Sequence, residues 1–136
     1  GDAYMCAGGL PAPRPGSTRD TALAALEMQA WLRDHNRDRQ AKGLPTLTMR
    51  AGIHTGTVVA GMVDDTKFQY DVWGDVVNIA ARMQESGAVG MVNITEENYL
   101  RLRDEPALRF TPRGRIAVKS KGELPMFFVE RADPVA

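Results

Sequence analysis

The sequence predicts an α+β domain in which helices flank a mainly antiparallel sheet. Three observations lead to this prediction. Several short stretches alternate apolar and polar residues, as half-buried strands do. Other segments are rich in helix formers and place apolar residues three and four positions apart. Short turns join some consecutive strands, helices separate others, and the total is about six strands and three helices.

The composition is that of an ordinary globular domain and excludes several classes of protein. The 136 residues are 43% hydrophobic, and 17 Lys+Arg balance 17 Asp+Glu, so the net charge is zero. Disordered chains are less hydrophobic and more charged, and general nucleic-acid binding needs excess positive charge. No apolar run approaches the length of a membrane span. We therefore expect no nucleic-acid partner and no membrane contact by this segment.

The single cysteine, Cys6, fits a reducing compartment. The first residues also lack the basic and apolar regions of a signal peptide. We expect a cytoplasmic location, including that of a cytoplasmic part of a larger or membrane-attached protein. The length suits one domain over residues 1–136.

The first predicted helix begins at Ser17. Ser17 and Asp20 have the spacing of a capping box, in which a hydroxyl and a later carboxylate satisfy free backbone N–H groups. The apolar stripe expected to face the core consists of Ala22, Leu23, Leu26, Ala30 and Trp31. Glycine and proline within residues 42–45 should end this helix. A second helix should open at Asp75, and a third should be capped by Thr95.

Alternation and turn residues predict the strands. These cover residues 48–54, 58–63, 68–73, 91–94, 115–119 and 126–131. A further short strand is expected over residues 3–7, which would bury Cys6 as a small apolar residue. Gly52, Gly56 and Gly61 lack the spacing of a phosphate-binding loop. We expect a tight hairpin or a close backbone approach at these glycines instead.

Polar residues recur on one side of the second predicted helix. Asn78 and Arg82 lie one turn apart there, and Asp71 ends the preceding strand. An arginine fork suits phosphate, an asparagine can bond a sugar or phosphate oxygen, and an aspartate can accept from an exocyclic amine. The spacing is compatible with a grip on a nucleotide. The alternative is a solvated helix face with an ion pair between Asp71 and Arg82.

The same segment resembles a known family. Residues 70–83 are similar to the Tyr-Asp-x-Trp-Gly-(Asp/Asn)-x-Val-Asn-x-Ala-x-Arg-Met pattern of class III adenylate and guanylate cyclase catalytic domains. Three further blocks resemble the family in its own order. They are Gly-Asp-x-Tyr-Met with Gly-Leu-Pro at residues 1–11, Arg-x-Gly-Ile-His-x-Gly with Ala-Gly at residues 50–61, and Arg-Gly with Val-Lys-x-Lys-Gly at residues 113–122. Within the last block Ser120 departs from the family glycine.

The resemblance implies a ferredoxin-like class III cyclase fold and substrate-binding roles for three residues. Arg50 matches an arginine that contacts the triphosphate, and Lys119 matches a lysine on the terminal phosphates. Asp71 matches the residue that reads the purine. An aspartate there resembles adenylate cyclases, whereas guanylate cyclases commonly carry a cysteine. The implied substrate is ATP.

The resemblance also implies the catalytic and metal-binding residues. Asn78 and Arg82 match the pair that orients the ribose and stabilises the transition state. Asp2 matches the second of two carboxylates that hold two divalent ions, and oxygen ligands suit Mg²⁺ or Mn²⁺. No general base is obvious, because His54 is more often a packed structural histidine in such a position.

The family domain normally starts with elements that this chain does not show. A strand with a Phe-x-Asp motif supplies the other metal carboxylate, and a later strand carries an adenine-reading lysine. We therefore expect residues 1–136 to form the C-terminal majority of the domain, to lack the first strand of the sheet, and to be weakly active or inactive alone. The unpaired strand edges would invite pairing with another chain.

The resemblance also implies a head-to-tail dimer. In such a dimer the metal carboxylates lie on one subunit, and the purine-reading and transition-state residues lie on the other. This chain carries Asp2 as well as Asp71, Asn78 and Arg82, so we expect a homodimer with sites at the subunit interface and regulatory domains in the parent protein. The leading hypothesis is an adenylate cyclase that makes cyclic AMP for signalling. The alternatives are a degenerate homologue that serves as a nucleotide-binding or dimerisation module, and a guanylate cyclase.

Overall fold

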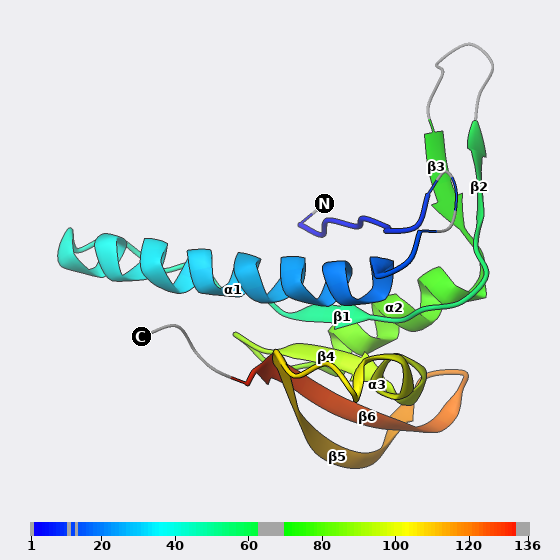
Figure 1. The fold of residues 1–136 in the computed structure, drawn as a ribbon. Coiled ribbons are helices and arrows are strands. Elements are labelled where there is room, and N and C mark those ends of the chain that lie inside the picture. Colours follow the sequence, from blue (N-terminus) through cyan, green and yellow to red (C-terminus); the bar gives the residue numbers. More distant parts are fainter. Residues whose placement is uncertain (1, 11, 13, 63–69, 133–136) are drawn as a thin grey trace.

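The computed structural model describes residues 2–10, 12, 14–62 and 70–132, without the side chains of residues 59, 60, 62 and 70–73. Helices and strands alternate along this part of the chain (Figure 1). The helices are α1 (Ser17–Ala41), α2 (Asp75–Glu85) and α3 (Glu96–Leu102). The strands are β1 (Ala51–Ile53), β2 (Val59–Met62), β3 (Tyr70–Trp73), β4 (Val92–Thr95), β5 (Leu108–Val118) and β6 (Gly122–Arg131). Within these bounds, no helix combines the length and the apolar character that a membrane span needs.

Four strands form one sheet in the order β1-β4-β6-β5, and β2 pairs with β3 separately. β6 is antiparallel to both of its neighbours, β4 and β5, whereas β1 runs parallel to β4. The parallel pairing requires a long connection, which β2, β3 and α2 provide. The predicted α+β class with a mainly antiparallel sheet is therefore confirmed. In Figure 1 the β2–β3 pair stands away from the four-stranded sheet.

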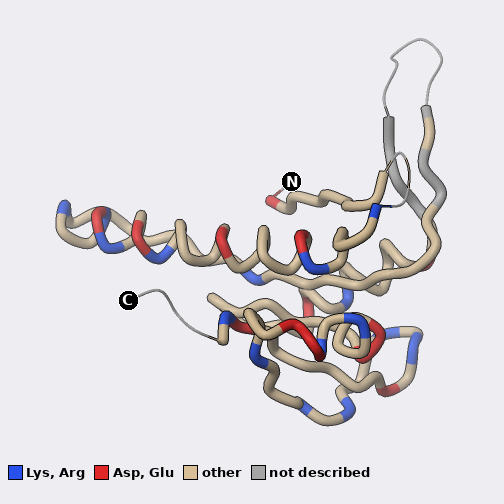
Figure 2. Tube along the Cα trace, viewed as in Figure 1, with Lys and Arg blue, Asp and Glu red and all other residues tan. Residues whose placement is uncertain are grey.

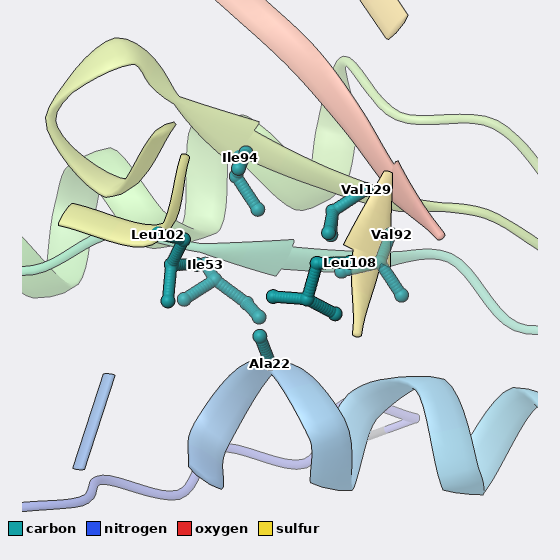
Figure 3. Packing of buried hydrophobic residues seen from close by; sticks show 7 residues of the cluster. All are labelled: Ala22, Ile53, Val92, Ile94, Leu102, Leu108 and Val129. Carbon is teal, nitrogen blue, oxygen red and sulfur yellow. The ribbon is translucent and has the colours of Figure 1, made fainter. Parts of the chain in front are cut away.

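Alternation along β4 gives the sheet two different faces. Val92 and Ile94 point into a cluster beneath α1 and α3, whereas Asn93 between them contacts Met83 of α2 and Met126 of β6. The first cluster, drawn in Figure 3, consists of Ala22, Ile53, Val92, Ile94, Leu102, Leu108 and Val129. The second, which we call the α2 cluster, consists of Met83, Val118 and Met126, with Ile79, Ile116 and Leu124 packed against it. Helices α1 and α2 therefore cover opposite faces.

A bulge divides β5 into halves that face opposite sides of the sheet. Pro112 and Gly114 pair with consecutive residues of β6, which leaves Arg113 as an extra residue. Because side chains alternate along a strand, Leu108 then faces the first cluster whereas Val118 faces the α2 cluster. The sequence prediction covered only the second half of β5, because proline and glycine at the bulge are typical of a turn.

The predicted apolar stripe of α1 is right in its first turns and wrong at Trp31. Trp31 is 63% exposed and stacks on His35. The buried residue on that side is Gln29, whose amide donates to the carbonyl oxygens of Met49 and Met91, both at 3.0 Å. Gln29 thereby ties α1 to the segments that enter β1 and β4. An apolar pattern does not reveal this position, because its buried contacts are polar.

The predicted capping box at the start of α1 is also wrong. Gly16 is the N-cap residue, with φ 80°, and none of the described side chains caps the helix. Ser17 is already helical, and the Asp20 carboxylate pairs with Arg14 at 3.0 Å instead. The other end agrees with the prediction, since α1 stops before Gly43, which adopts φ 71°.

The N-terminal segment departs from its predicted strand. Residues 3–7 have no strand pairing within the described chain, and Cys6 is exposed rather than buried. Gly8 lies beside the first turn of α1, where an added Cβ would be 2.7 Å from the Thr21 hydroxyl oxygen. An extended segment without a neighbouring strand or covering layer does not bury its side chains, which explains the exposure of the thiol.

Helix α2 lies against β1 with no side chain between them. A Cβ added to Gly52 would be 2.1 Å from the backbone nitrogen of Gln84 and 2.5 Å from the carbonyl carbon of Met83. Real Cβ atoms do not approach other atoms so closely, so this position admits only glycine. The expected close backbone approach is confirmed here, and it determines how deeply α2 sits on the sheet.

A histidine joins the end of β1 to the start of α3. The Nδ1 atom of His54 lies 2.8 Å from the Oγ1 atom of Thr95, and that oxygen also accepts from the backbone N–H of Asn98 at 3.4 Å, as the predicted cap. Burial lowers the pKa of His54, and the nearby carboxylates of Glu97 and Asp75 only partly oppose this effect. His54 is therefore a packed, neutral connector at neutral pH, as expected from the sequence.

Replacing Gly52 with alanine is expected to destabilise the protein by about 3 kcal/mol, because α2 must move away from β1. Gly61→Ala is the matched control and should change stability by less than about 0.5 kcal/mol. No described atom lies within 4 Å of a Cβ added at Gly61. Urea unfolding of the full-length protein measures both values. Equal effects of the two substitutions would show that α2 shifts freely.

Replacing His54 with glutamine is expected to make the free energy of unfolding depend less steeply on pH below pH 6.5. Because burial lowers the pKa of folded His54 below the usual 6.5, the unfolded chain takes up the proton first as the pH falls. Stability from this residue is complete above pH 6.5 and is lost between that value and the lower folded pKa. Urea unfolding across pH 5 to 8 tests this, and an unchanged slope in the variant would contradict it.

Candidate nucleotide-binding site

Helix α2 carries Asn78 and Arg82 one turn apart, as the sequence predicts. Asn78 is exposed. The Nη1 atom of Arg82 donates to the carboxylate of Glu85 at 2.8 Å, and 31% of the Arg82 side chain remains exposed. The guanidinium group is thus reachable from solvent and is already paired with an anion. Its partner is a neighbour on the same helix, a contact that the sequence prediction did not include.

The α2 cluster determines where the polar residues of the candidate site lie. Asn78 directly precedes Ile79, Arg82 directly precedes Met83, and Lys119 directly follows Val118. Because these apolar neighbours pack together, the backbone at the three polar residues lies beside one cluster. Residues from α2 and from the end of β5 are therefore brought near one another, although about 40 positions separate them in the sequence.

The turn between β5 and β6 carries Lys119, which is exposed. Ser120 follows it with φ 66°, a left-handed conformation that costs a non-glycine residue about 1–3 kcal/mol. The backbone N–H of Lys121 donates to the carbonyl of Val118 at 3.0 Å. The ammonium group of Lys121 lies 2.6 Å from the Asp75 carboxylate at the start of α2. The turn is thus attached to the helix that carries Asn78 and Arg82.

Arg50 lies at the other end of α2. Its guanidinium donates to the backbone carbonyl of Glu85 at 3.4 Å, and the Gln84 amide oxygen, oriented to accept, lies 3.2 and 3.3 Å from two of its nitrogens. Arginines near a helix C-terminus satisfy carbonyls that have no partner in the helix. In this structure Arg50 caps α2. Its predicted contact with a triphosphate stays a prediction.

Arg113 is a second arginine at this end of α2, and its role is structural. Its Nη1 atom donates to the carbonyl of Ser86 at 2.8 Å and to the Asn93 side chain at 3.0 Å. Its guanidinium lies over the ring of Phe128 at 4.1 Å. Burial lowers the pKa of Arg113, but these partners keep the charged group in place. The Arg-Gly pair of the family pattern therefore supports the bulge of β5 and the end of α2.

Asp2 lies exposed on the N-terminal segment. Within the described ranges no hydrogen bond or ion pair joins Asp2 to α2 or to the β5–β6 turn, and no group of three metal-binding side chains occurs. One carboxylate does not make a site for two ions. The carboxylates of the described residues therefore do not by themselves form a site for the two metal ions expected from the sequence.

Asp71 belongs to β3, where it pairs with Gly61 of β2. Its side chain lies outside the described part of the structure, as does the predicted alternative of an ion pair with Arg82. The purine-reading role of Asp71 stays a prediction. Its backbone position, a few residues before α2, is the one that the sequence predicts.

Sequence reasoning missed the partners of the site residues more than the residues themselves. Asp75 was expected only as an N-cap or first-turn carboxylate, and the structure places it in the first turn after the N-cap Gly74. Lys121 was expected only as a member of a motif. Glu85 carried no signal, because a single carboxylate at the end of a helix is common. Figure 2 shows acidic and basic residues interspersed along α1 and around the sheet, so overall charge does not mark the site either.

Comparison with known proteins identifies the relatives of this chain. The family model described as the adenylate and guanylate cyclase catalytic domain matches residues 1–131. A protein of Mycobacterium tuberculosis named adenylate cyclase is 42% identical over 132 residues, which cover 95% of this chain and 28% of that protein. The human guanylate cyclase soluble subunit beta-2 is 35% identical over 129 residues, which cover 95% of this chain and 20% of that protein.

Solved structures share the fold. The adenylyl cyclase CyaB from P. aeruginosa superimposes with a TM-score of 0.83 at 23% identity, over 93% of this chain and 66% of that chain. The guanylate cyclase domain of RhGC from Catenaria anguillulae, in complex with GTP, gives a TM-score of 0.80 at 24% identity, over 91% of this chain and 65% of that chain. The predicted cyclase fold is thereby confirmed. The chain belongs to the family of adenylate and guanylate cyclase catalytic domains.

Proposed function

We propose that the chain is the catalytic domain of an adenylate cyclase, which converts ATP to 3′,5′-cyclic AMP and pyrophosphate in signalling. The observation that carries this proposal is the placement of Asn78, Arg82 and Lys119 around the α2 cluster. An amide, a guanidinium and an ammonium group there are suited to a ribose, a reacting phosphoryl group and the terminal phosphates.

The reaction explains why these residue types would be needed. The ribose 3′-oxygen loses its proton and bonds to the α-phosphorus, while the bond from that phosphorus to pyrophosphate breaks. Negative charge increases on the phosphoryl oxygens as this happens, and a fixed guanidinium such as that of Arg82 would stabilise it. Asn78 would orient the ribose, and Lys119 and Arg50 would hold the triphosphate.

We infer ATP rather than GTP from Asp71, because a carboxylate accepts a hydrogen bond from the amine at C6 of adenine, whereas guanine carries an acceptor oxygen at that carbon. The mycobacterial relative named adenylate cyclase, at 42% identity, supports this choice. The human relative at 35% identity is a guanylate cyclase subunit, so GTP is the competing substrate. Since the chain spans 28% of the mycobacterial relative's length, the activity and regulatory domains of the whole protein are part of the proposal.

We also propose a homodimer with sites at the subunit interface. One chain carries Asp2 and the α2 residues, but no hydrogen bond or ion pair between described residues joins them. A second copy is the natural source of the missing half of each site. Cyclases of this family use divalent ions, and we propose Mg²⁺ or Mn²⁺ here, with Asp2 as one ligand. We place the domain in the cytoplasm because its single cysteine fits a reducing compartment.

The full-length protein is expected to form cyclic AMP from ATP in the presence of Mg²⁺ or Mn²⁺, and to form much less cyclic GMP from GTP. Product analysis by mass spectrometry measures both. Cyclic GMP as the main product would contradict the role given to Asp71. A folded dimer that binds ATP but makes neither product would favour the second candidate, a nucleotide-binding or dimerisation module, which the isolated Asp2 carboxylate supports.

Arg82→Ala is expected to lower kcat by about 100-fold or more while the affinity for ATP changes less than about fivefold. The reason is that the guanidinium should interact more strongly with the transition state than with bound ATP. Steady-state kinetics and equilibrium binding of ATP separate the two quantities. Arg37→Ala is the control, because Arg37 pairs only with Asp34 on α1 among described residues. Equal losses in binding and rate would make Arg82 a ground-state phosphate ligand.

A further inference from the structure

We propose that Lys121 and Asp75 form a positioning pair that fixes the β5–β6 turn against the start of α2. The pair would thereby set the place of Lys119 relative to Asn78 and Arg82. This inference rests on the proposed function, and it assigns a role to two residues that need not touch the nucleotide.

The contact that carries the proposal is short and joins distant segments. The Lys121 Nζ atom lies 2.6 Å from Oδ1 of Asp75, 46 positions away in the sequence. The α2 cluster holds the end of β5 through Val118, but the turn extends beyond it. Among the described residues no other hydrogen bond or ion pair connects the turn to α2. Lys121 is therefore the side chain that attaches the turn to the helix.

The backbone conformation of the β5–β6 turn also requires that Lys121 be held in place. Ser120 lies between Lys119 and Lys121 in a left-handed conformation, with φ 66°, that side chains other than glycine rarely adopt. A strained residue keeps such a conformation only when its neighbours are held in place. The contacts of Lys121 on one side and the packing of Val118 on the other supply that restraint. The backbone direction at Lys119 is coupled to Lys121 in this way.

Charge supports the same assignment. A carboxylate in the first turn of α2 suits the helix dipole, but it would repel an anionic phosphate bound near Lys119. The ammonium group of Lys121 balances the charge of Asp75 at 2.6 Å. The pair therefore leaves the charge of Lys119 available to a phosphate. Loss of Lys121 alone should be worse than loss of Asp75 alone, because it exposes an unbalanced carboxylate.

A double-mutant cycle in the full-length protein tests the pair. We expect Lys121→Gln to lower kcat/KM for ATP about tenfold and Asp75→Asn about threefold. The double variant should resemble Asp75→Asn rather than show the product of both losses, and Lys121→Arg should retain most activity. The matched control is the Lys42–Asp38 pair on α1, with the same residue types at 3.0 Å. Lys42→Gln should leave kcat/KM unchanged.

Two outcomes of the kinetics would overturn the pair. Losses that multiply in the double variant would show that the two residues act independently, as for a direct phosphate ligand. If Lys42→Gln lowered kcat/KM as much as the variants of the pair do, and all of them lowered the melting temperature equally, the effect would be a general loss of stability.

Hydrogen exchange tests the pair without any need for activity. Backbone amides of the β5–β6 turn should exchange faster in both single variants and in the double variant, to the same extent, and not in Lys42→Gln. Unchanged exchange in the turn would overturn the positioning pair. A wild-type protein that makes no cyclic nucleotide would instead overturn the proposed function, and the exchange result would still decide whether the pair holds the turn.

Discussion

The direct contact between Gly52 of β1 and the backbone of Gln84 in α2 is the constraint on which the candidate site depends. No side chain separates strand and helix there, so the distance between them has almost no freedom. Met83 is buried beside this contact and belongs to the α2 cluster. The outward residues Asn78 and Arg82 take their positions from the depth of the helix. The positions of Asn78 and Arg82 therefore depend on the absence of a Cβ at Gly52.

The C-terminal end of α2 gathers three arginines with different roles. Arg113 satisfies the carbonyl of Ser86 and lies over an aromatic ring, which makes it part of the framework. Arg50 caps the last turn from the segment before β1. Arg82 extends from the helix surface and pairs with the carboxylate of Glu85. Arginine binds carboxylate and phosphate groups with similar geometry. The same charged group thus contacts backbone carbonyls at two positions, whereas at the third it pairs with a side-chain carboxylate.

The sequence predicted the fold class, the order of the elements and the helix that carries the candidate site, because these follow from periodicity and from blocks of residues with a strict spacing. The sequence-based predictions were wrong or incomplete where a buried contact is polar or where an expected strand pairing is absent from the described residues. In the middle of α1 Gln29 is buried and Trp31 is exposed, because the partners of Gln29 are backbone carbonyls. Cys6 is exposed because no strand in the described part of the chain pairs with residues 3–7. The pairing of Lys121 with Asp75 depends on tertiary packing, which no local pattern encodes.

The bulge at Arg113 makes the β5–β6 hairpin sensitive to its length as well as to its side chains. Removing one residue there would give β5 a single alternation, and every position beyond it would change faces. Val118 would then face the side of the first cluster instead of the α2 cluster. A deletion at the bulge would therefore change which face of the sheet the end of β5 covers, whatever side chains that end carries.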